Sequence, residues 1–588
     1  MNKMAITVTR GPSLRAPFAA VIGQFGIPPA PLPDAATLTA RLAAWLPASL
    51  CQRLNVAENS ASLQHWLMHF AQTITESRGK MALPAVCGAH QQLAWVALGY
   101  CDAHATTQAM QFALTATLNA IGNTVADATL RRQATAVLRL QQQAQPDFQE
   151  RALMRVARRR GMPVYPVVDG SLVWQYGQGS KAWQCVETAT QADSRTGMML
   201  QRNKVQSNEL VRRLGLPGVT HRIATRPQQA IACAQQLGYP LVVKPLDRGQ
   251  GKGVTANINT PEDVVTAFRK AAAYSPQVIV ERFVAGNDYR IMVMGGKFQW
   301  AIQRNPPDVT GDGQSSLAEL IARKNALIAK KDLDRGFVKH VVIDGEVQRV
   351  LALHQVTLED RPAAGAVIPL RVNANVSTGG SYMDVTRHIH ADNRAMAETL
   401  ARAFRLDVVG VDFLTADIGR SWREGACAVI EVNATPMLFC DAHAEQWIDS
   451  KFADGENGRI PSVLLLCHSP AARDRALAEL ADLGPGVGVV TRTQASLDGC
   501  VRQFTRTTDA GAAAQALLLD PSCEALIVIC TANEIRQRGM PLDRMDAGAW
   551  TEETEPDQAL RELLYGSCNK AMKPCLSGCL PGPLPVVC

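Results

Sequence analysis

The sequence lacks the long apolar runs of a membrane protein. Its 588 residues contain no continuous stretch of about 18 apolar side chains, whereas a transmembrane helix needs about 20. Residues 1–20 are basic but have no continuous apolar segment, so we expect no secretory signal. These two absences predict a cytoplasmic protein with no membrane partner.

Charge of one sign is also scarce. The formal net charge is +7, which is small for this length, and charged residues make up 19% of the chain. Domains that bind nucleic acid usually carry a strongly basic patch or stripe, so we expect no nucleic-acid partner. A mildly positive balance is compatible with ligands that carry phosphate or carboxylate groups.

The fifteen cysteines lack the spacing of a metal site. Most stand singly in apolar segments, which is typical of reduced, buried thiols in a cytosolic protein. Four gather near the C-terminus, but they form no Cys-x2-Cys pair; they are Cys568, Cys575, Cys579 and Cys588. We therefore expect residues 566–588 to be a flexible tail rich in Cys, Pro and Gly rather than a zinc site.

Length and patterning predict a multidomain protein of α/β and α+β class, because one hydrophobic core rarely serves so long a chain. We expect an N-terminal domain at 1–160, a second domain at 161–457 and a smaller α/β domain at 458–565. Periodicity predicts helices at 128–143, 203–214 and 227–237, a hairpin at 164–168 and 172–176, and strands at 94–98, 241–244, 463–466, 487–490 and 525–528.

A predicted strand that ends in Lys244 runs into a glycine-rich loop. Glycines let backbone N–H groups approach phosphate oxygens, and a lysine adds a positive charge. The loop lacks the Lys-Ser/Thr ending of a Walker A motif, and alone it could equally be an ordinary turn. The candidate ATP-binding residues here are Lys244, Arg248, Gly249, Gly251, Lys252 and Gly253.

A second apolar strand ends in Glu281, and Asp288 follows seven residues later. An apolar strand ending in an acid suits the hinge of a nucleotide site, and an acid such as Asp288 can accept hydrogen bonds from ribose hydroxyls. Taken alone, the pair also fits a surface strand and turn. The hinge candidates are Glu281, Arg282, Phe283, Val284 and Asp288.

Three oxygen-bearing side chains lie in two further apolar strands. Asp412 stands in one, and Glu431 and Asn433 stand in the other, where strand alternation puts them on one face. Hard oxygen ligands of this kind suit Mg²⁺ bound to nucleotide phosphates. The alternative is a carboxylate paired with a buried arginine.

The order of these motifs resembles the ATP-grasp superfamily, whose enzymes phosphorylate a carboxylate and let an amine attack the acylphosphate. The resemblance implies ATP and Mg²⁺ as cofactors. Lys204 and Lys244 would then bind phosphates, the Glu281 segment adenine, and Asp288 ribose. Phosphoryl transfer needs positioning and charge neutralisation, so two arginines are catalytic candidates, or else members of surface salt bridges; they are Arg290 and, as the preferred one, Arg304.

Three further stretches, at residues 305–321, 373–380 and 431–436, resemble the cyanophycin synthetases over about 173–459. The loop at 373–380 offers amides, hydroxyls and backbone N–H groups, which suit carboxylates, and in that family it lies near the acceptor end of the growing polymer. The substrate-binding candidates are Asn375, Ser377, Thr378, Gly379 and Gly380. Thr435 and Met437 depart from the long enzymes, and residues 1–150 match loosely.

One departure concerns the Mur-ligase domain of the long cyanophycin synthetases. Residues 458–461 and the following strand match its start, but the loop at 467–473 has neither glycine nor lysine and cannot wrap phosphates in the same way. The pattern therefore resembles the shortened class, cyanophycin synthetase type 2, with a truncated, inactive Mur-like region. This resemblance implies a homo-oligomeric enzyme that joins β-aspartyl-arginine dipeptides to a cyanophycin polymer. Residues 161–457 would then be the catalytic domain, and residues 1–160 a candidate polymer-binding domain. The alternatives are another ATP-grasp peptide ligase, for example with a small acceptor, and a non-catalytic polymer-binding protein.

Overall fold

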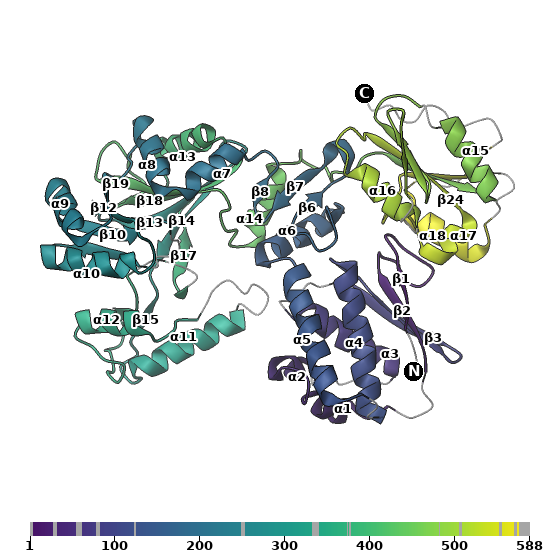
Figure 1. The fold of residues 1–588 in the computed structure, drawn as a ribbon, viewed down its shortest axis with the longest axis horizontal. Coiled ribbons are helices and arrows are strands. Elements are labelled where there is room, and N and C mark those ends of the chain that lie inside the picture. The colour runs from purple at the N-terminus through teal and green to yellow at the C-terminus, as the bar shows by residue number, and fades with distance from the viewer. Residues whose placement is uncertain are drawn as a thin grey trace. The chain divides into compact units, whose positions relative to one another are not determined.

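The computed structural model describes residues 4–27, 32–54, 62–77, 83–122, 125–247, 253–331, 340–372, 374, 378–480, 483–504, 509–551, 556–569 and 573–575. Its contacts divide the chain into two units. Unit 1 comprises Met1–Asp147, Met154–Gln184 and Phe452–Cys588, and unit 2 comprises Phe148–Leu153 and Cys185–Lys451. Both contain helices and sheets, which confirms the predicted mixed α/β class (Figure 1). The predicted domain boundaries stay predictions.

The N-terminal part of unit 1 is a four-stranded antiparallel sheet in the order β1-β2-β4-β3. Helices α3 and α4 pack together over a core that includes Trp66, Phe70 and Phe112. The elements are β1 (Ala5–Val8), β2 (Val21–Gly26), α1 (Ala35–Leu42), α2 (Ala48–Leu54), α3 (Leu63–Thr75), β3 (Ala85–His90), β4 (Leu93–Leu98), α4 (Ala103–Gly122) and α5 (Asp127–Ala144). The predicted strand at 94–98 and helix at 128–143 are therefore confirmed.

The C-terminal part of unit 1 is a seven-stranded sheet in the order β23-β22-β21-β24-β20-β25-β26. Strands β21, β24, β20, β25 and β26 run parallel to one another, and β22 and β23 extend the sheet in antiparallel fashion beside β21. This confirms the three predicted strands. The elements are β20 (Ser462–Cys467), α15 (Pro470–Leu480), β21 (Val487–Val490), β22 (Gln494–Leu497), β23 (Cys500–Gln503), α16 (Ala510–Leu518), β24 (Ala525–Thr531), α17 (Ala532–Arg538), β25 (Ala547–Thr551), α18 (Gln558–Ser567) and β26 (Lys573–Cys575).

Residues 148–190 contribute to both units and contain the predicted hairpin, because β5 pairs antiparallel with β6. A second hairpin, of β7 and β8, follows. The elements are α6 (Phe148–Arg159), β5 (Val164–Pro166), β6 (Trp174–Tyr176), a short 3-10 helix (Gly179–Lys181), β7 (Trp183–Val186) and β8 (Ala189–Thr190).

Unit 2 holds a four-stranded antiparallel sheet in the order β11-β10-β12-β9. Helices α9 and α10 pack on it, and the apolar residues of both helices and all four strands form one core. The elements are β9 (His221–Ala224), α9 (Pro227–Leu237), β10 (Leu241–Pro245), β11 (Thr255–Ile258), α10 (Pro261–Ala272) and β12 (Val278–Arg282). The predicted helix at 227–237 and strand at 241–244 are confirmed.

A five-stranded antiparallel sheet in the order β17-β14-β13-β18-β19 forms the rest of the unit 2 centre. Helix α13 packs across β13, β14 and β18 (Figure 1). The elements are α7 (Arg195–Arg202), α8 (Lys204–Arg213), β13 (Asn287–Met294), β14 (Lys297–Asn305), β17 (Ser381–Asp384), α13 (Ala391–Phe404), β18 (Val408–Thr415), β19 (Cys427–Asn433) and α14 (Asp441–Asp449). A satellite holds β15 (Asp308–Thr310), α11 (Leu317–Lys331), α12 (Gly345–Leu353) and β16 (Val367–Pro369).

Two further observations bear on the sequence predictions. Within the described ranges, every helix is too short or too polar to span a bilayer. Twelve cysteines in those ranges are free thiols, and seven of these twelve are buried. Of the predicted flexible tail, residues 570–572 and 576–588 lie outside the described residues, and Lys573–Cys575 form β26.

Candidate functional site

The five-stranded sheet of unit 2 has one apolar face and one charged face. Successive side chains of a strand point to opposite sides, and Tyr289, Ile291 and Val411 lie in the core with α13. The residues between them, Arg290 and Asp412, therefore share the other face. Register places the charged residues in two rows, with Arg304 opposite Asp288, and with Arg290, Asp412 and Glu431 side by side.

Two arginines and two aspartates form a buried network on this face. Arg290 Nε donates a short hydrogen bond to Asp412 Oδ1, and Arg304 Nη2 lies 3.0 Å from Asp412 Oδ2. Arg304 also donates to Asp288 Oδ1 from Nη2 at 2.5 Å and from Nε at 3.1 Å. Both aspartates therefore share Arg304, and the predicted metal ligand Asp412 is tied to both predicted catalytic arginines.

The network shifts the acidity of its members in opposite directions. Burial opposes ionisation of Asp412, but the charges of Arg290 and Arg304 and their hydrogen bonds hold its pKa below the usual value. For Asp288, burial and the charge of Asp412 outweigh Arg304 and raise the pKa to about 6. Burial disfavours the charge of Arg304, yet its two aspartate partners raise its pKa. Asp412 is thus the more firmly ionised aspartate.

Gly410 makes room for Arg290. A Cβ at this position would lie 2.8 Å from Arg290 Cδ and 2.7 Å from Pro436 Cβ, and such contacts are too close for real side chains. The glycine interrupts a valine-rich strand, and a glycine inside a strand often marks a close approach. This positioning residue was missed in the sequence analysis, although the lone glycine in β18 was a usable signal.

Lys204 and Glu431 form a second ion pair on the same sheet. Lys204 is the first residue of α8, whose N-cap Asn203 accepts from the backbone N–H groups of residues 205 and 206. This cap fixes the start of the helix, and Lys204 Nζ lies 3.0 Å from Glu431 Oε1. The predicted phosphate ligand and the predicted metal ligand are thus adjacent.

Lys244 and Glu281 form a third ion pair, in the four-stranded sheet. Antiparallel register pairs Lys244 with Ile279 and Glu281 with Val242, so the two charged residues are diagonal neighbours on one face. Lys244 Nζ lies 2.6 Å from Glu281 Oε1, and the two side chains are 10% and 7% exposed. Four predicted site cations therefore each contact a carboxylate. The four contacts are Lys204–Glu431, Lys244–Glu281, Arg290–Asp412 and Arg304–Asp288.

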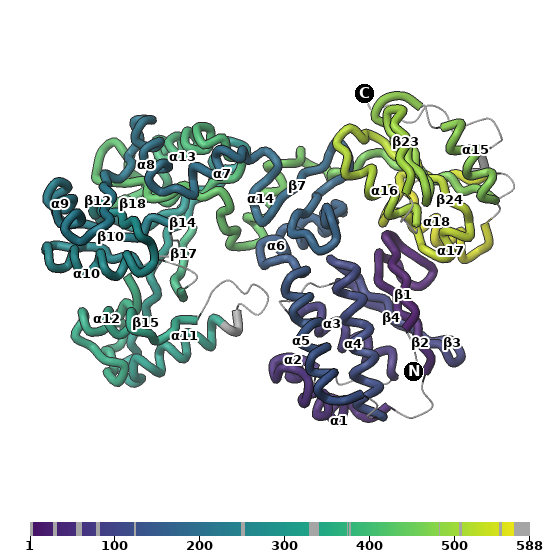
Figure 2. Tube along the Cα trace, in the orientation of Figure 1, coloured from purple at the N-terminus to yellow at the C-terminus, as the bar shows by residue number. Residues whose placement is uncertain are grey.

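The remaining hinge candidates carry the chain from one sheet to the other (Figure 2). The backbone N–H groups of Arg282 and Phe283 donate to the carbonyls of Thr220 and Pro240. Val284 then leads to Gly286, where a Cβ would lie 2.7 Å from the carbonyl carbon of Thr415 on β18. The hinge between β12 and β13 is therefore held by backbone contacts that leave no room for a side chain at position 286.

The glycine-rich loop and the substrate loop are described only in part. Arg248, Gly249, Gly251 and Lys252, like Asn375 and Ser377, lie outside the described residues. Gly253 has φ +74°, and a Cβ there would lie 2.8 Å from Tyr274 Cδ2, so this position requires glycine. Thr378, Gly379 and Gly380 directly precede β17, whose Tyr382 lies opposite Arg304.

The chemistry of the acidic residues fits a magnesium ion. Asp412 and Glu431 are direct cross-strand partners, and Asn433 lies opposite Gly410, two residues along the same face. Asn433 Nδ2 donates a hydrogen bond to Gly410 O at 3.3 Å. The side-chain oxygen of Asn433 is therefore available as a metal ligand. No cluster of three His, Cys, Asp or Glu residues suited to a metal occurs among the described residues. The candidate donor set instead combines two carboxylates, Asp412 and Glu431, with the amide oxygen of Asn433.

The chain is similar to one family model and to several curated proteins. Residues 210–306, which contain Lys244, Glu281, Asp288, Arg290 and Arg304, match the family model "D-ala D-ala ligase C-terminus". Two cyanophycin synthetases are similar to this chain. That of Trichormus variabilis is 28% identical over 411 residues, 68% of this chain and 45% of its own length. That of Synechocystis sp. is 29% identical over 391 residues, 64% and 44%.

A second group of relatives makes glutathione. The glutathione biosynthesis bifunctional protein of Pasteurella multocida is 29% identical over 261 residues, 42% of this chain and 34% of its own length. The crystal structure of a bifunctional glutathione synthetase from the same species covers 59% of this chain and 51% of its own, with a TM-score of 0.42 and 22% identity.

The chain is similar in sequence to one class of enzyme, the ADP-forming peptide ligases with an ATP-grasp fold. Within that class the predicted resemblance to cyanophycin synthetases is confirmed, since several of them are 28% or 29% identical over about two thirds of this chain. The chain matches somewhat less than half the length of these curated relatives.

Proposed function

We propose that this chain joins β-aspartyl-arginine dipeptides to the end of a cyanophycin polymer with ATP as energy source. The C-terminal carboxylate of the polymer attacks the γ-phosphorus of ATP, and the bond to ADP breaks. The α-amine of the dipeptide then attacks the carbonyl carbon of the acylphosphate, phosphate leaves, and the amine loses a proton to water. Each cycle forms one amide bond and releases ADP and phosphate.

The observation that carries this proposal is the Arg290–Asp412–Glu431 row on the charged sheet face, in a chain similar to cyanophycin synthetases over about two thirds of its length. Phosphoryl transfer depends on fixed charges that neutralise the transferred group. Arginines held by buried carboxylates have fixed orientations, and the Arg290–Asp412 pair is buried on both sides, with side chains 11% and 10% exposed.

We assign the roles that the resemblance to ATP-grasp ligases implies. Arg304 and Arg290 orient the transferred phosphoryl group, while Lys204 and Lys244 exchange their carboxylate partners for ATP phosphates. Glu281 and the backbone of residues 282–284 face adenine, and Asp288 faces ribose. The candidates outside the described residues, in the loops at 248–252 and 375–377, complete the phosphate and acceptor sites together with Gly253 and Thr378–Gly380.

Asp412, Glu431 and Asn433 would hold magnesium, which when bound neutralises charge on the nucleotide phosphates. The low pKa of Asp412 supports this role because metal ligation requires the ionised carboxylate. Lys204 is bound to Glu431 through a flexible four-carbon side chain. A small motion of this side chain is therefore enough to move Nζ from the carboxylate to a phosphate, without a change of the backbone.

The use of a dipeptide rather than separate aspartate and arginine rests on the C-terminal part of unit 1. A second ATP site would need a glycine-rich loop at the carboxyl end of a parallel strand. Between Cys467 of β20 and Pro470 of α15 there are only His468 and Ser469, and Arg473 is bound to Glu534 at 2.8 Å. This supports one ligase site per chain.

The test is phosphate release by purified full-length protein with ATP, Mg²⁺ and a cyanophycin primer. We expect release and polymer growth with β-aspartyl-arginine, and neither with free aspartate plus arginine. Release with the free amino acids but not with the dipeptide would refute the proposal. Asp417→Asn, on the loop after β18, serves as the control for carboxylate changes on the sheet.

A second candidate is a peptide ligase with a small acceptor, favoured by the similarity to glutathione biosynthesis proteins over 42% of this chain. Phosphate release with a small amine acceptor and without primer would support it. The homo-oligomeric state that the resemblance implies and the cytoplasmic location expected from the sequence stay predictions, tested by light scattering and by fractionation.

A further inference from the structure

The C-terminal part of unit 1 carries charged residues just beyond the carboxyl ends of three neighbouring parallel strands. Arg492 follows β21, Glu534 follows β24, and Arg473 follows β20. Ligands of open parallel sheets bind at this edge. The proposed ligase site lies in unit 2, so these residues serve another purpose.

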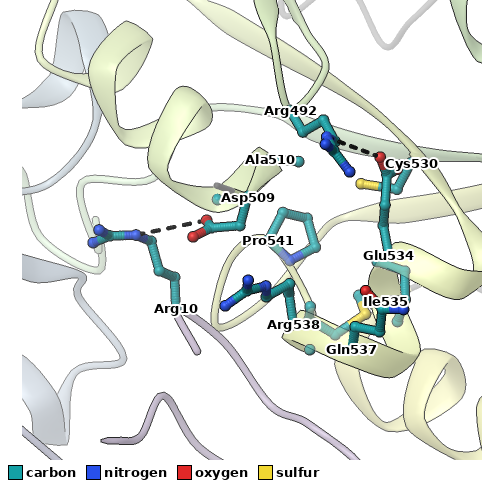
Figure 3. Close-up of a pocket in the computed structure, with 13 residues that line it drawn as sticks. Arg10, Arg492, Asp509, Ala510, Cys530, Glu534, Ile535, Gln537, Arg538 and Pro541 are labelled. Atoms are coloured by element: carbon teal, nitrogen blue, oxygen red, sulfur yellow. Dashed lines mark ion pairs between the residues drawn. The ribbon is translucent and has the colours of Figure 1, made fainter. Parts of the chain in front are cut away.

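A cavity of about 230 Å³ opens at this edge of the sheet (Figure 3). Since one water occupies about 30 Å³ of liquid volume, the cavity has room for a small molecule. Its charged lining comprises three arginines and two carboxylates, and Ile535, Met540 and Pro541 add apolar surface. The charged residues are Arg10, Arg492, Arg538, Asp509 and Glu534.

The position of Arg10 in this wall is fixed by close backbone contacts. Met540 N donates to Pro12 O at 2.7 Å. A Cβ on Gly11 would lie 2.0 Å from Leu542 O, and one on Gly539 would lie 2.7 Å from Pro12 O. The N-terminal segment and the loop after α17 therefore meet where neither glycine can carry a side chain (Figure 2), and the cavity wall is a built feature of unit 1.

Both carboxylates of the cavity are already engaged. Asp509 is the N-cap of α16 and accepts from Ala512 N at 2.7 Å. Glu534 accepts from Thr531 N at 2.7 Å in a capping box, and from Arg473 Nη1 at 2.8 Å. These bonds fix the orientation of both carboxylates, and the charged lining keeps three arginines against two carboxylates.

Two of the arginines, Arg10 and Arg538, hold donors in reserve. Arg10 Nη1 donates to Gln515 Oε1, whereas Arg10 Nε lies 3.8 Å from Asp509 Oδ1, which is beyond hydrogen-bond distance. Arg10 Nε is buried and donates no hydrogen bond. Arg538 has no hydrogen-bond or ion-pair partner in the part of the chain that the structure describes, and Figure 3 shows its side chain at the same hollow as Arg10.

We propose that this cavity binds a small organic anion through a carboxylate or phosphate group held by Arg10 and Arg538. Guanidinium groups bind both kinds of anion with paired, charge-assisted hydrogen bonds. The anion accepts from the Arg538 guanidinium and from the remaining Nη2 donor of Arg10, whose Nη1 is bound to Gln515, and the apolar lining takes the organic part of the ligand. This second site is independent of the proposed ligase site, since it lies in unit 1 and needs no ATP.

The test is calorimetric titration of the full chain with malonate and, separately, with inorganic phosphate, in a chloride buffer of constant ionic strength. We expect saturable binding of at least one of them. Arg538→Gln should weaken it about tenfold, because one charge-assisted contact is lost. Arg536→Gln is the matched control, since Arg536 lies on the same helix but pairs with exposed Asp557, and it should leave the affinity unchanged.

Tighter binding of malonate would assign the site to carboxylates, and tighter binding of phosphate would assign it to phosphate esters. Arg10→Gln gives an independent variant if Arg538→Gln lowers the unfolding temperature. Absence of saturable binding by both anions, or equal affinities in Arg538→Gln and Arg536→Gln, would overturn the proposal. Because the readout is binding without ATP, it stands or falls apart from ligase activity.

Discussion

Asp412 and Glu431 lie directly opposite each other on β18 and β19, and each carboxylate has its own cation. Arg290 reaches Asp412 from β13, and Lys204 reaches Glu431 from the start of α8. Like charges at opposite positions of antiparallel strands repel each other, so the two cations stabilise the arrangement. The two cations thereby allow the two carboxylates to lie side by side, as the proposed metal site would need.

The first prediction concerns Glu431→Gln. The amide keeps the size of the side chain but loses the charge that would bind magnesium, so we expect kcat to fall by at least about a hundredfold. The fold should remain, because Glu431 is partly exposed and glutamine can still accept from Lys204. Phosphate release and the unfolding temperature are the two measurements.

Glu424→Gln is the matched control, because Glu424 is exposed and pairs only loosely with Arg420 at 3.9 Å. Its activity should equal that of the unchanged protein. Full activity in Glu431→Gln would show that the metal is held elsewhere.

The second prediction concerns Gly410→Ala. The added methyl group would meet Arg290 Cδ at 2.8 Å and Pro436 Cβ at 2.7 Å, so Arg290 must leave its place beside Asp412. We expect kcat to fall by about tenfold or more, since small displacements of positioning groups are costly to catalysis. Gly425→Ala is the control, because a Cβ there has open space around it. If both variants keep full activity, the position of Arg290 does not matter for turnover.

The sequence predicted the strands and the shared face of Glu431 and Asn433, because a two-residue period is a local property. It left open whether Asp412 binds metal or pairs with a buried arginine. The structure shows the arginine pairing directly, and the position of Glu431 keeps the metal role open as well. The two alternatives are therefore compatible, which a reading of one strand at a time does not reveal.

The partners of the charged residues could not be predicted, because they depend on strand register and on contacts across hundreds of residues. Lys204 and Glu431 are 227 positions apart, and Arg290 and Asp412 are 122 apart. The cavity around Arg538 was missed for the same reason, since Arg10 belongs to its wall from the other end of the chain. Local patterns fix faces and periods, whereas pairing between strands depends on the whole sheet.

The third prediction concerns the pH dependence of stability. His443 stacks on Trp300 with ring centroids 4.0 Å apart, and its Nδ1 accepts from Phe439 N at 3.2 Å. Burial lowers the pKa of His443 to about 4 from 6.5, against the weaker opposing charge of Asp384. The unfolded chain thus takes up this proton first as the pH falls, and native stability decreases from about pH 6.5 down to about pH 4.

The decrease attributable to His443 should be about 2 kcal/mol, after allowance for its partial burial. Chemical denaturation at several pH values measures it. His443→Gln keeps an acceptor for Phe439 N but cannot take up a proton, so its stability curve should be flatter by that amount. His354→Gln changes an exposed histidine and should leave the slope as it is; equal slopes in all three proteins would contradict the assignment.

The fourth prediction concerns Arg473, which lies in the first turn of α15. Arg473 Nη1 donates to Glu534 at 2.8 Å, and the two side chains are 10% and 15% exposed. Truncation in Arg473→Ala leaves a largely buried carboxylate without this partner, so we expect a loss of about 2 kcal/mol in stability of unit 1. Arg475→Ala changes an exposed residue of the same helix and should cost less than about 0.5 kcal/mol.

Ligase activity separates a structural role of Arg473 from a nucleotide-binding one. The segment at 467–473 comprises the end of β20 and the start of α15. If this segment does not bind phosphate, Arg473→Ala should keep the kcat and the KM for ATP of the unchanged protein at temperatures well below its unfolding transition. A raised KM for ATP with unchanged stability would instead reveal a working second nucleotide site. That outcome would also remove the reason for a dipeptide substrate, since two ATP sites would allow aspartate and arginine to be added one after the other.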